Sequence, residues 1–457
     1  MAILRKTRIQ SKRDSRHDKP RLIGLLRLVT QVRNILTDRQ HVTLNRLADD
    51  LGDRFRIRLG FGNAVFLSDP VSVGHVLSLD ESSMTTGIAR QRLAGMFPEH
   101  CLLYADGEKH IRMRRAIAKA FSESVRAFDT PNQFEKLVSK VRHSNRPDLS
   151  DLIYDCLVDV TSNLIFGVAP KEICHAANQA MRQFSQIPTA VVLFPRLQHM
   201  PLYRRGFIEY RQAQQDFERQ VAKCLDYSPD CFFAAMKRQQ FAGNLLSQEV
   251  CDNATFFFLV MIRTMSTLFS NVARALAVEN RWQERLRVEE DLRGEMAASR
   301  LRRAVVKETI RLFPFAPIYV RRAVIDQEID GFKIRKGEYI VLSPDLIHHR
   351  KATFPNPQCF SPERFFEHQH HGSFVPFGGG TRHCIGSGWI LDSMSELLKV
   401  LLPIVKFQTH GDHFGPHDFS MHTIFRTPRR RGFSSVIRTD LSGLGESNNF
   451  ADICEAT

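Results

Sequence analysis

The segment from residue 377 to residue 386, with the sequence FGGGTRHCIG, constrains the fold of this chain more than any other feature. Its three adjacent glycines permit backbone angles closed to other residues and let the chain approach a flat ligand closely. No Gly-Lys-Ser/Thr follows them, which argues against a phosphate-binding loop. Cys384 lies just before a predicted helix from Ile390 to Val400, where backbone amides and the helix dipole favour a thiolate. Such a soft anion is what haem iron needs as an axial ligand for splitting dioxygen, so we predict that Cys384 binds iron.

Length and composition indicate one large domain with an additional segment at each end. The 457 residues contain no Pro/Gly/Ser-rich linker, and 43% hydrophobic with 25% charged residues fits a folded globular protein. The formal net charge is +15; residues 1–21 hold eight Lys/Arg against two Asp, which leaves +6 in this arm and +9 elsewhere. We expect a basic arm with an amphipathic segment at residues 1–38, a catalytic domain at 39–438 and a polar tail at 439–457.

The basic excess does not indicate binding to nucleic acid, because no aromatic interleaving or zinc-finger spacing accompanies it. The sequence has no run of about twenty apolar residues, so we expect no membrane-spanning helix. Residues 22–36 are apolar but contain Arg27 and Arg33, which favours an amphipathic surface helix and at most peripheral membrane contact. The Arg-rich start also resembles a mitochondrial transit peptide, although Asp14 and Asp18 weaken that interpretation. The nine cysteines are dispersed without a Cys-x-x-Cys pair, and we expect a cytoplasmic location.

Hydrophobic periodicity predicts a mainly α fold with a small β-rich lobe. Spacings of three and four residues predict helices at 108–121, 149–166 and 252–288. Two short β-type runs, 54–57 and 64–67, flank glycines and predict a hairpin. Residues 318–342 alternate again, with turn residues between short runs. We expect the lobe to be built from residues near 54–70, from 318–342 and from the end of the chain.

The cysteine segment resembles the signature of the cytochrome P-450 family, Phe-x-x-Gly-x-Arg-x-Cys-x-Gly. Phe377, Gly380, Arg382, Cys384 and Gly386 fill its five fixed positions. The resemblance implies the cytochrome P-450 fold and haem b (iron protoporphyrin IX), with Cys384 as the axial thiolate and metal ligand. A buried cysteine in a glycine-rich turn is the structural alternative, and so many matched positions disfavour it.

A second motif supports this resemblance, which extends from about residue 51 to about residue 438. Glu308 and Arg311 are three residues apart and therefore lie on one helical face, able to pair. Alone such a pair means little, since surface pairs contribute roughly 0–1 kcal/mol. The family joins it with an arginine from a Pro-Glu-Arg-Phe segment, which is Arg364 here. We expect this network to position the cysteine loop and to be structural, not catalytic.

The resemblance assigns His110, Arg114, Arg322 and Arg382 to the two haem propionates. His110 and Arg114 are four residues apart, so a helix presents both to the same side. Arginine offers a forked donor for carboxylates. Arg321 is an alternative to its neighbour Arg322, and strand alternation favours Arg322. His110 is alternatively a polar surface residue.

The distal helix departs from the family pattern. The family's Ala/Gly-Gly-x-Asp/Glu-Thr falls on residues 260–264, which read VMIRT, and only Thr264 is retained. Arg263 replaces the acid of the proton relay, and a permanently protonated guanidinium relays protons poorly. Either Arg263 binds a substrate carboxylate, as in the fatty-acid peroxygenase branch of the family, or it points away, forms a structural ion pair and leaves proton delivery to ordered water. A shift of register would make Thr267 the relevant hydroxyl.

The function implied by the resemblance is oxygen insertion from O2 into an apolar small-molecule substrate. A ferredoxin or flavodoxin-type donor would supply electrons on the basic face near Cys384. Apolar residues at 256–259 and 313–318 are candidates for the pocket wall, although each is alternatively plain core. The alternatives are peroxide-dependent oxygenation or an electron-independent rearrangement, with Arg263 binding a substrate carboxylate. A non-enzymatic haem sensor or binding protein is a further alternative, because the proton relay is incomplete.

Overall fold

A computed structural model of the chain describes residues 40–59, 62–86, 95–143, 150–167, 171–187, 191, 195–224, 227–316, 318–367, 373–409, 419–422, 425–428 and 433–437. The predicted basic arm at 1–38, its amphipathic segment at 22–36 and the polar tail at 439–457 lie outside the described residues.

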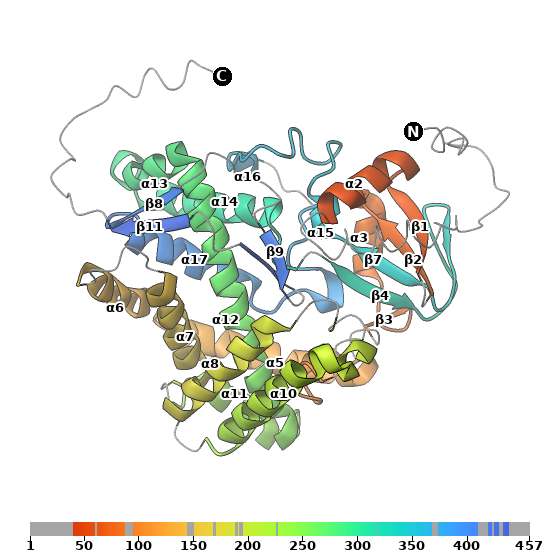
Figure 1. Ribbon diagram of the computed structural model, residues 1–457, viewed down its shortest axis with the longest axis horizontal. Helices are drawn as coiled ribbons and strands as arrows, with labels where there is room; N and C mark the ends of the chain where they lie inside the picture. The colour runs from red at the N-terminus through yellow and green to blue at the C-terminus, as the bar shows by residue number, and fades with distance from the viewer. Residues whose placement is uncertain are drawn as a thin grey trace.

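Helices dominate the structure, as the periodicity predicts (Figure 1). Their bounds are α2 Gln40–Leu51, α3 Pro70–Ser78, α5 Gly107–Ala127, α6 Thr130–Arg142, α7 Ser150–Phe166, α8 Lys171–Gln186, α10 Pro201–Ala222, α11 Phe232–Phe241, α12 Ser247–Val278, α13 Asn280–Arg293, α14 Glu295–Leu312, α15 Pro344–Ile347, α16 Arg364–Glu367 and α17 Ser387–Leu401. The predicted helices at 108–121 and 149–166 are confirmed as α5 and α7. The helical segment predicted at 252–288 is two helices, because the non-helical backbone of Glu279 (φ −95°, ψ 60°) ends α12 and begins α13.

The small lobe is a five-stranded sheet in the order β1-β2-β7-β4-β3 (Figure 1). The strands are β1 Arg54–Leu59, β2 Gly62–Leu67, β3 Met84–Thr85, β4 Tyr319–Ala323 and β7 Tyr339–Leu342, and β2 and β7 are the parallel pair. A separate hairpin, β5 Gln327–Ile329 and β6 Phe332–Ile334, turns at Asp330 (φ 46°) and Gly331 (φ 78°), so both turn residues have positive φ. The predicted strands at 54–70 and 318–342 are therefore confirmed.

Both faces of the sheet are covered, and side-chain alternation decides which residue faces which helix. On one face Val65 and Ile340 pack with Val73 and Val76 of α3. On the other face a second cluster packs against α2; it contains Phe66, Val341, Leu44 and Leu47. The α3 side of the sheet is the side against which the cysteine loop packs, as described below.

The end of the chain does not belong to this lobe, so that part of the prediction is wrong. β8 Val405–Thr409 pairs with β11 Phe433–Ile437, and β9 Phe419–His422 pairs with β10 Phe425–Pro428, in two separate sheets. Figure 1 places β8 and β11 beside α13. The side-chain amide of Gln283 in α13 explains this position, since it donates to the Phe407 carbonyl (3.1 Å) and accepts from the Phe407 amide (2.8 Å).

α12 forms the axis of the helical part and contacts α7, α10, α11 and α14. Among the described helices, it is the one long and apolar enough to cross a membrane by length and composition, yet 67% of its most apolar stretch is buried inside the fold. Such burial is typical of a core helix.

A buried charge network joins α14 to the segment before the cysteine loop, as predicted. Glu308 and Arg311 are both fully buried and form a two-pronged pair at 2.7 and 2.8 Å. Arg364 adds a third charge, with its Nε 3.1 Å from the Glu308 carboxylate. The backbone amide of Ser361 donates to the same carboxylate oxygen at 2.9 Å. The Glu308 carboxylate is thus fully engaged, which compensates for the cost of burying it.

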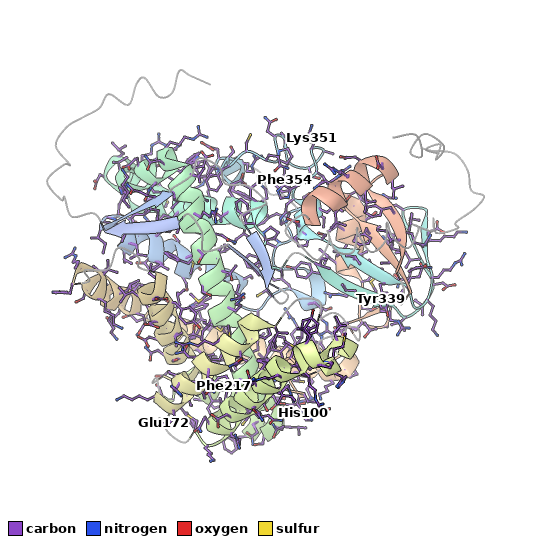
Figure 2. The ribbon with its side chains drawn as sticks, in the orientation of Figure 1. His100, Glu172, Phe217, Tyr339, Lys351 and Phe354 are labelled. Carbon is purple, nitrogen blue, oxygen red and sulfur yellow. The ribbon has the colours of Figure 1, made fainter. Side chains whose placement is uncertain are left out.

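Arg311 extends the network through backbone carbonyls. Its guanidinium donates to the carbonyls of His348 (2.9 Å), Pro357 (2.8 Å) and Cys359 (3.2 Å). It also lies over the ring of Phe354, 5.2 Å from the centroid. Figure 2 labels Phe354, close to Lys351 in the view. One side chain therefore fixes three separate points of the loop between α15 and α16.

His348 carries the network to the cysteine loop. Its Nε2 accepts the backbone amide of Val375 (3.0 Å), so the proton resides on Nδ1, which lies 3.2 Å from the Arg311 carbonyl. Burial, aided by the charge of Arg311, lowers the pKa of His348 well below its usual value and keeps the ring neutral. Val375 lies two residues before Phe377, the first residue of the cysteine segment. The network therefore sets where that segment begins, which is a structural function.

Replacing Glu308 with glutamine should destabilise the fold by about 3–5 kcal/mol, because two buried guanidinium groups lose their counter-ion. Urea unfolding followed by circular dichroism measures this change. Glu363→Gln is the matched control, because Glu363 lies in the same segment but is half exposed and pairs loosely with Arg285 (3.8 Å). Equal losses in the two variants would contradict the structural importance of the network.

Candidate active site

The cysteine loop is closed on itself by a hydrogen bond from the Cys384 amide to the Phe377 carbonyl (2.9 Å). Gly378 (φ 68°) and Gly380 (φ 60°) adopt left-handed conformations that favour glycine. A Cβ on Gly380 would overlap the carbonyl of Leu77 in α3. The glycines therefore allow the loop to pack closely against α3, while their close approach to a flat ligand stays a prediction.

Cys384 lies three residues before α17, the helix predicted from Ile390 onwards. Its side chain is accessible, although protein atoms surround much of it. Burial raises the pKa of the Cys384 thiol, while the backbone amide of Gly386 and the charge of Arg114 act in the opposite direction. The two stabilising groups come from the helix start and from α5, so they favour the thiolate from different sides.

α5 connects the loop to the rest of the site through the two residues predicted at its N-terminal end. Arg114 donates from Nη2 to the carbonyl of His383 (2.5 Å), the residue before Cys384. His110 is 2% exposed and its Nδ1 lies 2.7 Å from a carboxylate oxygen of Glu81. The alternative that His110 is a surface residue is therefore wrong.

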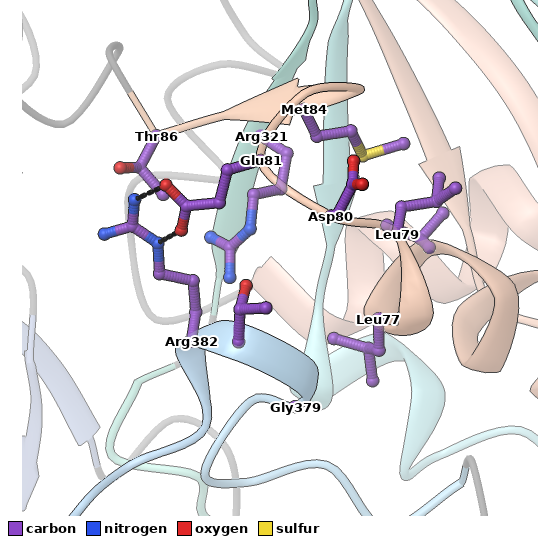
Figure 3. Close-up of a pocket in the computed structure, with 11 residues that line it drawn as sticks. Leu77, Leu79, Asp80, Glu81, Met84, Thr86, Arg321, Gly379 and Arg382 are labelled. Atoms are coloured by element: carbon purple, nitrogen blue, oxygen red, sulfur yellow. Dashed lines mark hydrogen bonds and ion pairs between the residues drawn. The ribbon is translucent and has the colours of Figure 1, made fainter. Parts of the chain in front are cut away.

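Arg382 of the loop binds the same Glu81 carboxylate that His110 of α5 contacts; Figure 3 shows the pairing of Arg382 with Glu81. Its Nε and Nη2 lie 2.7 and 2.8 Å from the two oxygens of Glu81. Nη2 also donates to Asp106, the residue before α5, at 2.8 Å. Glu81 comes from the turn between α3 and β3, so this contact joins three parts of the chain distant in sequence.

Arg321, and not Arg322, lies on the side of the sheet that faces this cluster. In β4 the residues two positions before and after Arg321, Tyr319 and Ala323, pack in the α3-side cluster of the sheet and so share its face. Arg321 lines a small cavity together with Glu81 and Arg382 (Figure 3). The prediction of Arg322 is corrected accordingly.

Arg322 lies on the opposite face of β4. Its guanidinium lies 5.9 Å from the ring centroid of Tyr339, and its Nε donates to the Gly337 carbonyl (3.3 Å). Alternation identifies which residues share a face, but the packing of α3 and the cysteine loop decides which face points inwards.

Arg321 is half-buried and has no carboxylate partner among the described residues. Its Nη1 donates to the carbonyl of Val320 (3.2 Å), a weak substitute for an anion. Burial, together with the nearby charge of Arg382, lowers the pKa of Arg321 to about 10. A partly desolvated arginine without a counter-ion favours the approach of an anionic ligand.

The residues that the sequence assigns to the distal side lie in the middle of α12. Thr264 is buried, and the neighbouring Thr267 hydroxyl is buried with no hydrogen-bond partner within the described chain. Arg263 faces α7, where Tyr154 is the neighbour that affects its charge. Burial lowers the pKa of Arg263, and its buried Nε has no hydrogen-bond partner in the part of the chain that the structure describes. The structural ion pair considered for Arg263 is thus not found among the described residues.

Apolar side chains of α12 form a partly accessible wall on the same stretch of helix. Phe256 and Val260 pack with Phe97, and the rings of Phe97 and Phe256 are 5.3 Å apart at their centroids. Phe257 and Met261 are half-buried beside the main core. Phe258 and Leu259, by contrast, are 0% and 4% exposed and are plain core residues. Of the residues predicted at 256–259 for the pocket wall, Phe256 and Phe257 are partly accessible, whereas Phe258 and Leu259 belong to the core.

Comparison with known proteins decides the family. The family profile described as Cytochrome P450 matches residues 19–389, more than half of the chain. The chain belongs to the cytochrome P450 family.

The relatives differ in how much of the chain they cover. Human cytochrome P450 4V2 is 38% identical over 102 residues, which are 21% of this chain and only 19% of that protein. Two Mycobacterium tuberculosis proteins match more widely. Putative cytochrome P450 136 is 26% identical over 71% of this chain and 70% of its own length, and putative cytochrome P450 135A1 is 22% identical over 87% and 91%.

Among solved structures, the fold is similar to retinoic acid-bound cyanobacterial CYP120A1. The TM-score is 0.70 with 17% identity, covering 86% of this chain and 93% of that one. The cytochrome P450 fold predicted from the sequence is therefore confirmed.

The described residues fit the haem that this family binds through a cysteine thiolate. Cys384 presents an accessible thiol, and His110, Arg114, Arg321 and Arg382, here called the basic cluster, lie around the same loop. Two members of the cluster already hold a carboxylate, that of Glu81, so the donor set suits propionates. Cys384 would hold the iron, whose thiolate ligation supplies the capacity to activate oxygen.

Three residues of the site were not predicted. Glu81 lies in a polar segment without any periodic signal, and His348 acts through contacts distant in sequence. Asp106 carried a signal, since an Asp before a predicted helix is a typical N-cap. Its side chain makes no cap hydrogen bond and instead accepts from Arg382 and Thr86 (2.6 Å).

Replacing Arg321 with glutamine should weaken haem retention by roughly tenfold or more, since a lost charged hydrogen bond is equivalent to about 1.5–3 kcal/mol. The rate of haem transfer from the holoprotein to apomyoglobin measures retention. Arg322→Gln removes the same charge one residue away and should leave the rate unchanged. A larger effect of Arg322→Gln would restore the original assignment.

Proposed function

We propose that this cytochrome P450 inserts one oxygen atom from O2 into an apolar organic substrate. The observation that carries the proposal is the partly accessible apolar wall of α12, which includes the half-buried Phe257 and Met261. The Phe257 ring lies 6.5 Å from the ring of Phe121, which in turn lies 6.3 Å from Trp389 in α17, the helix that follows the cysteine loop. Apolar walls bind ligands chiefly by removing hydrocarbon surface from water. A substrate without charge would therefore find favourable contacts here.

The electron donor is a ferredoxin or flavodoxin-type protein with an acidic surface. Arg115 and Lys119 support this assignment, because they are exposed on α5 one turn apart. The same helix holds the cysteine loop through Arg114, so a donor bound there would be near Cys384. The chain as a whole carries a net charge of +15, which accelerates the approach of acidic partners.

Thr264 delivers protons on the distal side in this proposal. Its hydroxyl is on the helix that forms the apolar wall, whereas Arg263 faces α7. A positioned proton donor is typically responsible for a rate factor of roughly 10²–10⁴. The unpartnered Thr267 hydroxyl is one turn away and suits a water-mediated second step.

A second candidate function follows from Arg263. Its buried Nε lacks a hydrogen-bond partner in the described part of the chain, and burying an unpaired guanidinium is costly. A substrate carboxylate would relieve that cost, and peroxide-dependent oxygenation or an electron-independent rearrangement of an acidic substrate would then replace O2 chemistry. A non-enzymatic haem sensor is the third possibility, since residue 263 is not an acid.

We also propose a cytoplasmic location with at most peripheral membrane contact. The support is the sequence itself: dispersed cysteines, a basic arm and interrupted apolar residues at 22–36.

Turnover under two oxidant conditions tests the proposed function. The purified protein is incubated with a panel of apolar substrates, each as a neutral compound and as its carboxylic acid. One arm contains NAD(P)H with a ferredoxin system, and the other contains peroxide. We expect product from neutral substrates in the first arm, with a loss of at least roughly tenfold in Thr264→Val, because proton delivery fails.

Arg263→Ala distinguishes the candidates in the same experiment. Under O2 insertion, this variant keeps turnover of neutral substrates. Turnover that needs peroxide, needs a substrate carboxylate and disappears in Arg263→Ala would replace the proposal with the second candidate. Absence of product in both arms, with the haem bound, would favour the sensor.

A further inference from the structure

The Glu81 carboxylate is held by the groups that the haem propionates require. Its Oε1 lies 2.7 Å from both His110 Nδ1 and Arg382 Nε, and its Oε2 lies 2.8 Å from Arg382 Nη2. The backbone amide of Gly107, the first residue of α5, donates to Oε2 at 2.7 Å. The Glu81 side chain is 7% exposed, so the contacts are shielded from water.

These contacts keep Glu81 ionised. Burial by itself would raise the pKa of Glu81, but the pairing with His110 and the charge of Arg382 outweigh it, so the pKa is below its usual value. The group is therefore a carboxylate at neutral pH, of the same chemistry and charge as a propionate. Two carboxylates that need the same donors repel each other and compete for them.

The hold on Glu81 is incomplete in one respect. Glu81 Oε1 and His110 Nδ1 approach closely but are not aligned for a hydrogen bond, so both atoms lack an aligned partner. Asp106 meanwhile takes a share of Arg382 Nη2 (2.8 Å). The Glu81 carboxylate is therefore held by charge more than by aligned hydrogen bonds. Such binding suits a carboxylate that a haem propionate partly displaces.

The balance of charges also indicates that Glu81 and the haem propionates compete for the same cations. Arg321, Arg382 and Arg114 are three permanent cations of the basic cluster, and Glu81 with Asp106 already offsets two of them. A haem brings two further carboxylates to this region. Arg321, which has no carboxylate partner among the described residues, is the donor that remains available.

We propose that Glu81 is an internal competitor of the haem propionates. Before the cofactor binds, Glu81 keeps His110 and Arg382 assembled. Once the haem is bound, Glu81 limits how tightly the haem is held and keeps the haem reduction potential low. Glu81 is thus a positioning residue that acts through the basic cluster. The low potential follows because a nearby negative charge disfavours addition of an electron to the haem.

Glu81→Gln tests the proposal, since glutamine keeps the shape and one acceptor but removes the charge. The haem-loaded variant should lose haem to apomyoglobin more slowly than the unmodified protein, by roughly tenfold or about 1.4 kcal/mol. Its midpoint potential, from a spectroscopic redox titration, should shift to a more positive value. Both readouts are independent of substrate turnover.

Asp80→Asn is the matched control. Asp80 is the adjacent carboxylate, but it is exposed and accepts hydrogen bonds from Ser82 (3.1 Å) and Ser83 (3.2 Å) within the turn. It should leave haem loss and midpoint potential near the values of the unmodified protein, because water screens its charge.

The competing explanation is that Glu81 only braces the site. In that case Glu81→Gln would lose haem faster than the unmodified protein and keep its midpoint potential, because His110 and Arg382 would no longer be held in place. Faster haem loss, or an unchanged potential, would overturn the proposal. Equal shifts in Asp80→Asn and Glu81→Gln would also overturn it, since the effect would then be one of net charge alone.

Discussion

The buried carboxylate of Glu308 is the constraint on which the catalytic part of the structure depends. It fixes Arg311 and Arg364, and Arg311 in turn holds three backbone carbonyls around α15 and α16. His348 then accepts a hydrogen bond from the Val375 amide and so fixes the backbone just before the cysteine loop. A loop rich in glycine has many conformations, so its single observed one needs such external restraints.

A second set of restraints comes from the opposite side of the loop. α3 excludes any side chain at Gly380, and α5 binds the His383 carbonyl through Arg114. The thiol of Cys384 is thus placed by α3, α5 and the network around Glu308, elements that are far apart in sequence. The sheet supports this arrangement because its α3-side face presents Arg321 to the same region.

The sequence predicted what local periodicity and spacing determine. The main helices, the hairpins and the pairing of Glu308 with Arg311 belong to this class, because residues three or four apart share a helical face. It favoured Arg322 over Arg321 wrongly, since alternation does not say which face of β4 points inwards until α3 packs. It also assigned the terminal strands to the wrong lobe, because the contact between Gln283 and Phe407 spans 124 residues. Glu81 was missed because its role arises from charges that only the tertiary fold assembles.

The reduced carbon-monoxide difference spectrum of the purified protein tests the central claim that the cysteine loop is built to present Cys384 as the iron ligand. The account predicts a thiolate-type spectrum for the unmodified chain and its loss in Cys384→Ser, with the fold retained by circular dichroism. A thiolate-type spectrum that persists in Cys384→Ser, or its absence from a fully haem-loaded unmodified protein, would contradict the account.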